Sequence, residues 1–180
     1  MQQLTEIRPA TLDDLNELLS IRQDPKVAEF HYRYSDEDKL FREVIECGKY
    51  KNAEDVRLTT LLCSDSIVGY IFHSHASTEE NVVAACGWSL HPKFWGLGIM
   101  TKGMKLLLSQ FFDAESHTHV YATCFVSNKR CIRLLKRLRF ERWNYPIGYR
   151  IACMYRARSL RWEHMYGMTA ERWSSSMEKQ

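Results

Sequence analysis

Apolar positions in the first third of the chain predict one strand and two helices. Residues 5–8 alternate weakly between polar and apolar, which predicts a short strand. Apolar residues at helical spacing follow in residues 12–22, with Thr11 as the predicted N-cap. A second amphipathic helix is predicted between Ser35, the expected N-cap, and Gly48, the expected C-cap.

The middle of the chain predicts a hairpin and then a buried strand. Residues 56–63 alternate in part and residues 67–72 form an apolar run, with a polar turn at 64–66 between them. Residues 82–90 are apolar at both odd and even positions. A strand with this pattern is covered on both faces, so we expect it at the centre of a sheet.

The C-terminal half alternates helix and strand again. The predicted elements are a helix at residues 99–112, a strand at 120–126, a helix with a basic outer face that starts at Asn128, and strands at 140–143 and 149–155. Gly103 interrupts the first of these helices, and close packing on the sheet would explain it. Part of the tail after residue 158 predicts a packed helix.

Composition indicates a class of protein rather than a fold. The 180 residues are 45% hydrophobic and 26% charged, as in ordinary globular domains. The net charge of +3 suits an anionic cofactor but is too small to indicate nucleic acid. The six cysteines form no C-x-x-C pair, so we interpret them as reduced core residues of a cytoplasmic protein and expect no zinc site. No apolar run reaches the length of about 18 residues that a membrane span needs.

Candidate chemistry is concentrated at residues 91–101, where two glycines join the central strand to the next helix. This stretch reads His-Pro-Lys-Phe-Trp-Gly-Leu-Gly-Ile-Met-Thr. A helix start leaves backbone N–H groups free and favours negative charge, so the turn predicts a phosphate or pyrophosphate site. The Walker A pattern fails because Met104 and Lys105 follow Gly103. The dinucleotide pattern fails because Thr101 occupies the third glycine position.

Residues 95–101, preceded by Leu-His-Pro-Lys-Phe, resemble the acyl-coenzyme A pyrophosphate loop of the GNAT N-acetyltransferase superfamily. They are most similar to its ribosomal-protein N-terminal acetyltransferase-like branch. A second landmark lies one strand later, where Asn128 and Cys131 resemble the family's Asn-x-x-Ser helix. A weaker third is Ile-Arg-Pro followed by Asp-Asp-Leu, at residues 7–15. The chain departs from the family pattern at Trp95, Met100, Cys131 and Arg139.

The resemblance implies an α+β fold. Its expected architecture is the GNAT fold, a central mixed and mostly antiparallel sheet of about six to seven strands flanked by about four helices. A V-shaped splay between two strands holds acetyl-CoA. We expect a single acetyltransferase domain over residues 1–180, with its core at about 5–156 and a C-terminal extension at 158–180.

The resemblance also implies how acetyl-CoA, the co-substrate, is held. Backbone N–H groups of residues 95–101 bind the pyrophosphate. A lysine, at position 93, 102 or 136, meets a further phosphate or lies on a solvated face. An N–H of Leu90 or His91 holds the acetyl carbonyl. The expected cofactor-binding residues are Leu90, His91, Trp95, Gly96, Leu97, Gly98, Ile99, Met100, Thr101, Asn128 and Lys136.

The implied reaction is direct attack of an amine on the thioester in a ternary complex. The expected catalytic residues are Cys131, His91 and Asn128. Asn128 binds the pantetheine arm or simply caps its helix. Cys131 protonates the leaving thiolate or is a core cysteine. Three tyrosines are alternative proton donors: Tyr145, Tyr149 and Tyr155.

The general base has several candidates. Many relatives place a glutamate on the strand before the loop, but residues 82–90 contain no carboxylate. His91 has a suitable unperturbed pKa and position. His73 and His75 end the preceding strand, and two glutamates lie just outside at residues 79–80. A water chain with no dedicated base is a further alternative.

Two other functions stay open from the sequence. The missing strand carboxylate allows a catalytically inactive CoA-binding or regulatory module. The basic face within residues 129–142 allows an RNA-binding domain, although we interpret it as a solvated helix face. The expected acceptor is a primary amine, either a protein N-terminus or a small molecule such as a polyamine or aminoglycoside. We expect no membrane or nucleic acid partner, and a monomer or homodimer.

Overall fold

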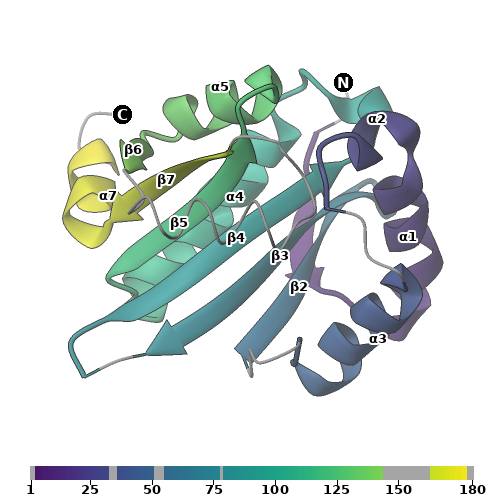
Figure 1. Cartoon of the computed structure of the whole chain (residues 1–180), viewed down its shortest axis with the longest axis horizontal. Helices are drawn as coiled ribbons and strands as arrows, with labels where there is room; N and C mark the ends of the chain where they lie inside the picture. Colours follow the sequence, from purple (N-terminus) through teal and green to yellow (C-terminus); the bar gives the residue numbers. More distant parts are fainter. Residues whose placement is uncertain (1–2, 33–35, 51–54, 78, 144–162, 178–180) are drawn as a thin grey trace.

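The chain forms one mixed sheet with helices on both faces. The computed structural model describes residues 3–32, 36–50, 55–77, 79–143 and 163–177. Within them, seven strands lie in the order β1-β2-β3-β4-β5-β7-β6 (Figure 1). All neighbours are antiparallel except β4 and β5, which are parallel. The strands are β1 (Glu6–Pro9), β2 (Asp55–Cys63), β3 (Ser66–Ser77), β4 (Val82–Leu90), β5 (His119–Phe125), β6 (Glu141–Trp143) and β7 (Glu163–Thr169).

The described residues contain six α-helices, against about four expected. They are α1 (Leu15–Gln23), α2 (Pro25–Ala28), α3 (Glu37–Cys47), α4 (Ile99–Ser109), α5 (Lys129–Arg137) and α7 (Ala170–Met177). The two extra helices are the one-turn α2 and the C-terminal α7, which occupies part of the tail where a packed helix is predicted. None of the described helices is long and apolar enough to cross a membrane.

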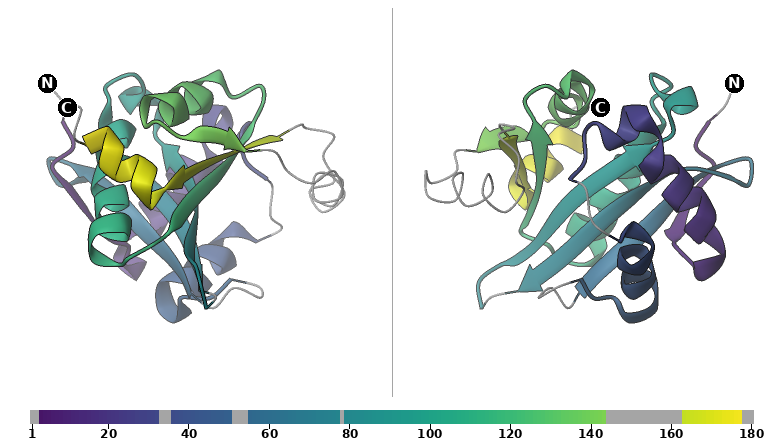
Figure 2. Two further views of the ribbon diagram at one scale, coloured as in Figure 1. Left: turned by 90° about the vertical axis from the view of Figure 1, so that its left-hand side faces the viewer. Right: turned by 45° about the vertical axis from the view of Figure 1, so that its right-hand side comes forward.

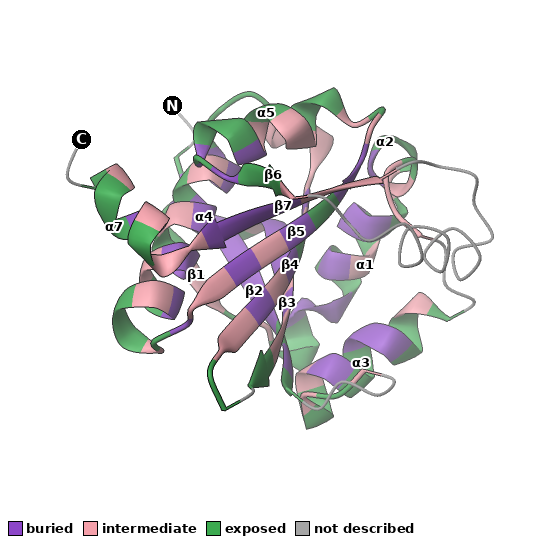
Figure 3. Cartoon of the chain, turned by 60° about the vertical axis from the view of Figure 1, so that its left-hand side comes forward, coloured by how far each residue is buried: buried purple, intermediate pink, exposed green. Residues whose placement is uncertain are grey.

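Two apolar clusters cover the two faces of the sheet, because side chains alternate along each strand. Tyr70 packs with α1 and α3 on one face, whereas Ile71 packs with α4 and α5 on the other. These helices lie on opposite sides of the sheet (Figure 2), and their buried residues form stripes toward it (Figure 3). Gly103 allows close approach of α4, because a Cβ there would lie 2.6 Å from Leu61 Cδ2. The expected reason for this glycine is confirmed.

The helix ends follow local capping chemistry. Gly48 ends α3 with a positive φ of 64°, as predicted. Ser35, the predicted N-cap of α3, lies outside the described residues, and the adjacent Asp36 accepts the hydrogen bond from Lys39 N instead, at 2.9 Å. The predicted helix at residues 12–22 begins as a 3₁₀ turn, Leu12–Asp14, before it continues as α1.

The C-terminal strands differ most from the prediction. Residues 149–155, the predicted partner of β6, lie outside the described residues. β6 pairs with β7, a segment for which no strand is predicted, and β7 also pairs with β5. Tyr166 and Met168 anchor β7 in the core, and Gly167 leaves room for the Trp143 ring of β6 above its backbone. Seven residues with one glycine give a weak strand signal, so cross-strand packing decides this element.

The parallel pair β4 and β5 separates along its length. Their pairing runs from Val83 with His119 to Cys86 with Ala122 and then stops. β4 continues to Leu90, still paired with β3, whereas β5 continues to Phe125, paired with β7. The expected V-shaped splay therefore opens after Cys86, and it leaves one edge of β4 without a partner strand.

A bidentate ion pair joins β1 to the start of α1. The Arg8 guanidinium donates to both Asp14 carboxylate oxygens, at 2.7 and 2.8 Å, and Thr11 N donates to Asp14 Oδ2 at 2.7 Å. These bonds hold the pKa of the buried Asp14 carboxyl below its ordinary value, and the bond from Arg8 has the largest effect. The carboxylate therefore contributes stability above its unfolded-state pKa of about 3.9, and this stability is lost as pH falls through the folded-state pKa.

We expect Asp14→Asn to lower the free energy of unfolding by about 1–3 kcal/mol at pH 7, because it removes charged bonds to a buried acceptor. The difference from wild type should shrink below about pH 4. Urea unfolding at several pH values measures it. Asp13→Asn, at the exposed neighbouring position, is the matched control. A deficit that stays the same at all pH values would contradict the role of the ion pair.

Candidate active site

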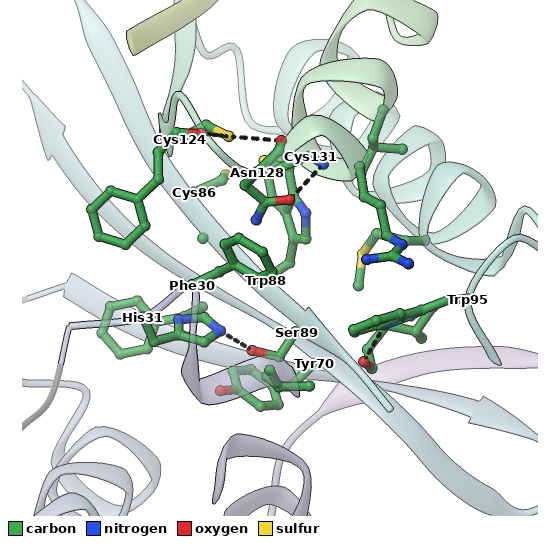
Figure 4. A pocket seen from close by; sticks show the side chains of 18 of the residues that line it. Phe30, His31, Tyr70, Cys86, Trp88, Ser89, Trp95, Cys124, Asn128 and Cys131 are labelled. Atoms are coloured by element: carbon green, nitrogen blue, oxygen red, sulfur yellow. Dashed lines mark hydrogen bonds between the residues drawn. The ribbon is translucent and has the colours of Figure 1, made fainter. Parts of the chain in front are cut away.

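A cavity of about 460 Å³ lies where β4 and β5 separate (Figure 4). This volume is typical of small-molecule sites. One part, the glycine-loop half, is lined by the loop after β4 and by the starts of α4 and α5. The other part, the α1–α2 half, lies on the opposite face of the sheet. Its lining includes Arg22, His31, Tyr70, Ser89 and Glu163.

The glycine-loop half presents free backbone N–H groups at the start of α4. Gly96 and Gly98 have φ of 83° and 77°, a left-handed conformation that glycine adopts without strain. The first bond of α4 runs from Lys102 N to Gly98 O, so the N–H groups of Ile99, Met100 and Thr101 have no partner within the helix. Together with the helix dipole they suit a phosphate.

Trp95 fixes the loop to the end of β4. Its indole Nε1 donates to Leu90 O at 2.7 Å (Figure 4). The Arg130 guanidinium of α5 lies 4.5 Å from the centre of its ring. The aromatic side chain thus joins the loop, β4 and α5. This structural role accounts for a tryptophan where the family pattern has a polar residue.

The free edge of β4 presents backbone donors to the cavity. His91 N donates to Val68 O on β3 at 2.8 Å, so this N–H is not available to a ligand. Amides alternate between the two edges of a strand, so those of Trp88 and Leu90 point away from β3. Pairing with β5 has ended at Cys86, and these two N–H groups therefore face the gap. Leu90, and not His91, can offer an N–H to a carbonyl oxygen.

Asn128 and Cys131 lie together in the wall of the cavity (Figure 4). Asn128 caps α5, and its Oδ1 accepts from Cys131 N at 3.0 Å. The Cys131 thiol interacts with Cys124 Sγ, and this contact, together with burial, raises the pKa of Cys131 above that of an ordinary thiol. Cys131 is therefore protonated at neutral pH and is not an activated nucleophile.

The cations near the glycine loop are arginines of α5. Arg130, Arg133 and Arg137 line the cavity, whereas the exposed Lys136 does not. Neither of the other two predicted lysines lines it: Lys93 is exposed, and Lys102 Nζ donates to Leu4 O at 3.1 Å. The predicted basic face of α5 is present, but its arginines line the cavity and the predicted Lys136 does not.

Polar groups in the α1–α2 half are mostly paired. His31 Nε2 lies 2.8 Å from Ser89 Oγ. Burial, and to a smaller extent the positive charge of Arg22, lowers the pKa of His31 to about 3. Arg22 binds Glu37 at 2.9 Å and Tyr32 O at 2.6 Å. The Tyr70 hydroxyl is fully buried and lies close to Ser89 and Arg22.

Glu163, the first residue of β7, is the carboxylate in the cavity wall. It lies opposite Phe125 on β5, so both side chains are on the α1–α2 face. Burial raises the pKa of the Glu163 carboxyl, and the Tyr32 hydroxyl partly offsets the rise. No other Asp or Glu among the described residues lines the cavity. Glu163 is not among the residues expected from the sequence, because β7 itself is not predicted.

The structure brings most of the predicted site residues together. Leu90, Trp95, Gly96, Gly98, Ile99, Met100, Thr101, Asn128 and Cys131 line the cavity, and His91, Leu97 and Lys136 do not. The His91 ring packs against the backbone that follows it, where its Nδ1 accepts a hydrogen bond from Lys93 N at 3.2 Å. His73 and His75 also lie outside the lining, and burial lowers the pKa of His73 to about 3. The three predicted alternative tyrosines lie outside the described residues.

Residues 5–141 match the family model of the acetyltransferase (GNAT) domain. Among solved structures, an acetyltransferase (GNAT family) from Bacillus anthracis is 19% identical, with a TM-score of 0.73, covering 95% of this chain and 98% of that one. The ribosomal-protein-S5-alanine acetyltransferase from Vibrio fischeri is 16% identical, with a TM-score of 0.74 and coverages of 96% and 98%. An aminoglycoside acetyltransferase in complex with coenzyme A is 15% identical, with a TM-score of 0.72 and coverages of 95% and 98%. No curated protein matches the chain in sequence.

Proposed function

The chain belongs to the GNAT acetyltransferase family, and on this basis we propose that it transfers an acetyl group from acetyl-CoA to a primary amine. The observation that carries the proposal is the position of the glycine loop beside the free edge of β4. We also propose a single acetyltransferase domain, which includes β7 of the expected C-terminal extension because β7 is an interior strand of the sheet. Cytoplasmic action fits the five described cysteines, which are all free thiols.

In the proposed complex, acetyl-CoA occupies the glycine-loop half. The pyrophosphate binds the free N–H groups at the start of α4, and Arg133 and Arg137 meet a further phosphate. The pantetheine arm passes Asn128 and enters the gap between β4 and β5. Leu90 N–H then donates to the thioester carbonyl and stabilises the oxyanion that forms during attack.

The amine approaches from the α1–α2 half, where Glu163 provides the carboxylate. A carboxylate attracts the ammonium form, and a raised pKa makes Glu163 a stronger base for its proton. This proposal places the base on β7, whereas the residues expected from the sequence were His91, the histidines of β3 or the glutamates at 79–80, with a water chain as the alternative. The neutral His31 lies in the same half and can orient the amine.

After the attack, the nitrogen loses its second proton to solvent water. The tetrahedral intermediate then collapses by breaking the bond from carbon to sulfur, and the thiolate leaves beside Cys131. An unionised thiol there can donate a hydrogen bond to the sulfur. The raised pKa of Cys131 makes complete proton transfer to a thiolate uphill. We therefore propose that Cys131 stabilises the leaving sulfur and that the proton finally comes from water.

The charge of the cavity favours a substrate with one ammonium group. Glu163 is the single carboxylate among the described lining residues. Its half of the cavity also contains Lys26 and Arg22, of which Arg22 is paired with Glu37. A polyamine or an aminoglycoside carries several ammonium groups, and one carboxylate can pair with only one of them. A protein N-terminus carries one, with an ordinary pKa of about 7.7–8.0 that makes deprotonation easy. We therefore propose a protein N-terminus as the acceptor.

Calorimetry with acetyl-CoA and a thiol-release assay test the proposal. We expect one molecule of acetyl-CoA to bind per chain, with release of CoA thiol when a peptide with a free N-terminus is added. N-terminally blocked peptide is the matched control, and spermidine and an aminoglycoside complete the panel. Absence of acetyl-CoA binding at millimolar concentration would overturn the proposed function. Binding without thiol release from any amine would instead indicate a CoA-binding module without turnover.

A further inference from the structure

Three histidines form a hydrogen-bonded chain outside the cavity. His73 Nδ1 lies 2.7 Å from His75 Nε2, and His75 Nδ1 lies 2.8 Å from His117 Nε2. Thr59 Oγ1 lies 3.0 Å from His73 Nε2 at one end, and Phe111 O lies 3.2 Å from His117 Nδ1 at the other. The chain thus links β2, β3 and the segment between α4 and β5, and none of its members lines the cavity.

When the three rings are neutral, the carbonyl at one end determines where every proton of the chain lies. Phe111 O can only accept, so His117 carries its proton on Nδ1, and its Nε2 accepts from His75 Nδ1–H. By the same step, His75 Nε2 accepts from His73 Nδ1–H, and His73 Nε2 accepts from the Thr59 hydroxyl. Burial lowers the pKa of His73 and of His75, which favours their neutral form. Neutral imidazole is the form that binds metal ions.

Glu115 brings a carboxylate to the same place. One nitrogen from each of His75 and His117 and one oxygen of Glu115 lie within 4.8 Å of one another. Gln110 Nε2 holds Glu115 Oε1 at 2.7 Å, and Glu115 Oε2 lies 3.8 Å from His117 Nδ1. The Glu115 side chain is 26% exposed and His75 is half-buried, so the cluster is open to solvent on one side.

We propose that His75, His117 and Glu115 bind a zinc-type divalent transition metal ion. Two imidazole nitrogens and a carboxylate are a common zinc ligand set, and water would complete a tetrahedral site. The ion would lie between His75 Nδ1 and His117 Nε2, which must move apart by about 0.5 Å to give zinc–nitrogen bonds of about 2.0–2.1 Å. This differs from the expectation of no zinc site, which rested on cysteine spacing alone.

The hydrogen-bonded chain already supplies the outer partners that such ligands need. His117 keeps Nδ1–H bonded to Phe111 O, a partner that metal-bound histidines often have. His75 must free Nδ1, so it carries its proton on Nε2 and donates to His73 Nδ1. His73 in turn carries its proton on Nε2 and donates to Thr59 Oγ1. The three rings hold three protons before and after binding, so each stays neutral, and His75 and His73 change tautomer.

Zinc titration of the full chain, treated first with a chelator, tests this site. We expect one Zn²⁺ per chain with micromolar or tighter affinity and a higher Tm in its presence. Glu115→Gln preserves shape at a partly exposed position and should weaken binding at least tenfold, and His75→Gln should weaken it more. His119→Gln and Cys47→Ser are matched controls that remove a histidine and an exposed thiol elsewhere and should bind like wild type.

The tautomer change gives a second readout, because nitrogen NMR of the imidazoles distinguishes Nδ1–H from Nε2–H. Zinc should move the proton of His75 and of His73 from Nδ1 to Nε2 and leave His117 unchanged. No binding with about 100 μM of protein and zinc, or full affinity in Glu115→Gln, would overturn the proposal. A thiolate charge-transfer band with Co²⁺ would also overturn it, because cysteines would then be the ligands. These measurements do not involve acetyl transfer, so they are independent of the proposed function.

Discussion

Gly96→Asp should weaken acetyl-CoA binding roughly 100-fold. The new carboxylate would lie beside the proposed pyrophosphate site, and two unit charges about 5 Å apart repel by about 3 kcal/mol at an effective dielectric constant of about 20. A Cβ at Gly96 meets no atom within 4 Å, so the side chain itself fits. Calorimetric titration with acetyl-CoA measures the change.

Gly96→Asn is the matched control for this experiment. Asparagine has the shape of aspartate without its charge, and both tolerate the positive φ of 83° better than other side chains. We expect Gly96→Asn to lose less than about tenfold in affinity and both variants to unfold at similar temperatures. Added salt should recover part of the loss in Gly96→Asp alone. Equal losses in the two variants would mean that the loop does not hold an anion.

Glu163→Gln should lower kcat/KM for an amine acceptor by roughly 100-fold to 10,000-fold, the range of a general base. The amide keeps the size of the side chain but cannot accept the proton. In the wild type, the rate should rise with pH through the Glu163 pKa, which burial places above the ordinary value of about 4.3. Initial rates of thiol release across pH measure both effects.

Glu43→Gln, at an exposed position of α3, is the matched control for the loss of a carboxylate. Acetyl-CoA affinity should be unchanged in Glu163→Gln, because Glu163 lies in the α1–α2 half and the proposed acetyl-CoA site in the glycine-loop half. A variant with normal kcat/KM would leave the water chain as the route for the proton. A variant with weakened acetyl-CoA binding would contradict this division of the cavity.

The glycine loop illustrates what a local pattern determines. Two glycines between an apolar strand and an amphipathic helix require one backbone path, so β4, the turn and the start of α4 were all predictable. Asn128 was predictable for the same reason, because an N-cap depends on its own helix. Which lysines or arginines of α5 line the cavity was not predictable, because this depends on which side of the helix faces the loop.

Glu163 and the histidine chain illustrate what local patterns cannot give. Glu163 belongs to the site because β7 pairs with β5, a contact between segments about 40 residues apart. The histidines of β3 meet His117 through the end of α4, again across about 40 residues. Both depend on sheet order and helix packing, and a single sequence contains no direct signal of such distant contacts.

The order of the strands has a consequence for where this domain can be cut. β7 follows β5 and β6 in the sequence but lies between them in the sheet. A nascent or truncated polypeptide that stops at residue 141, where the family model ends, has the glycine loop and Asn128 but no β7. It would retain the proposed acetyl-CoA site and lack Glu163, the proposed base. Expression boundaries drawn from the family match alone would therefore give a protein that we expect to bind acetyl-CoA without transferring its acetyl group.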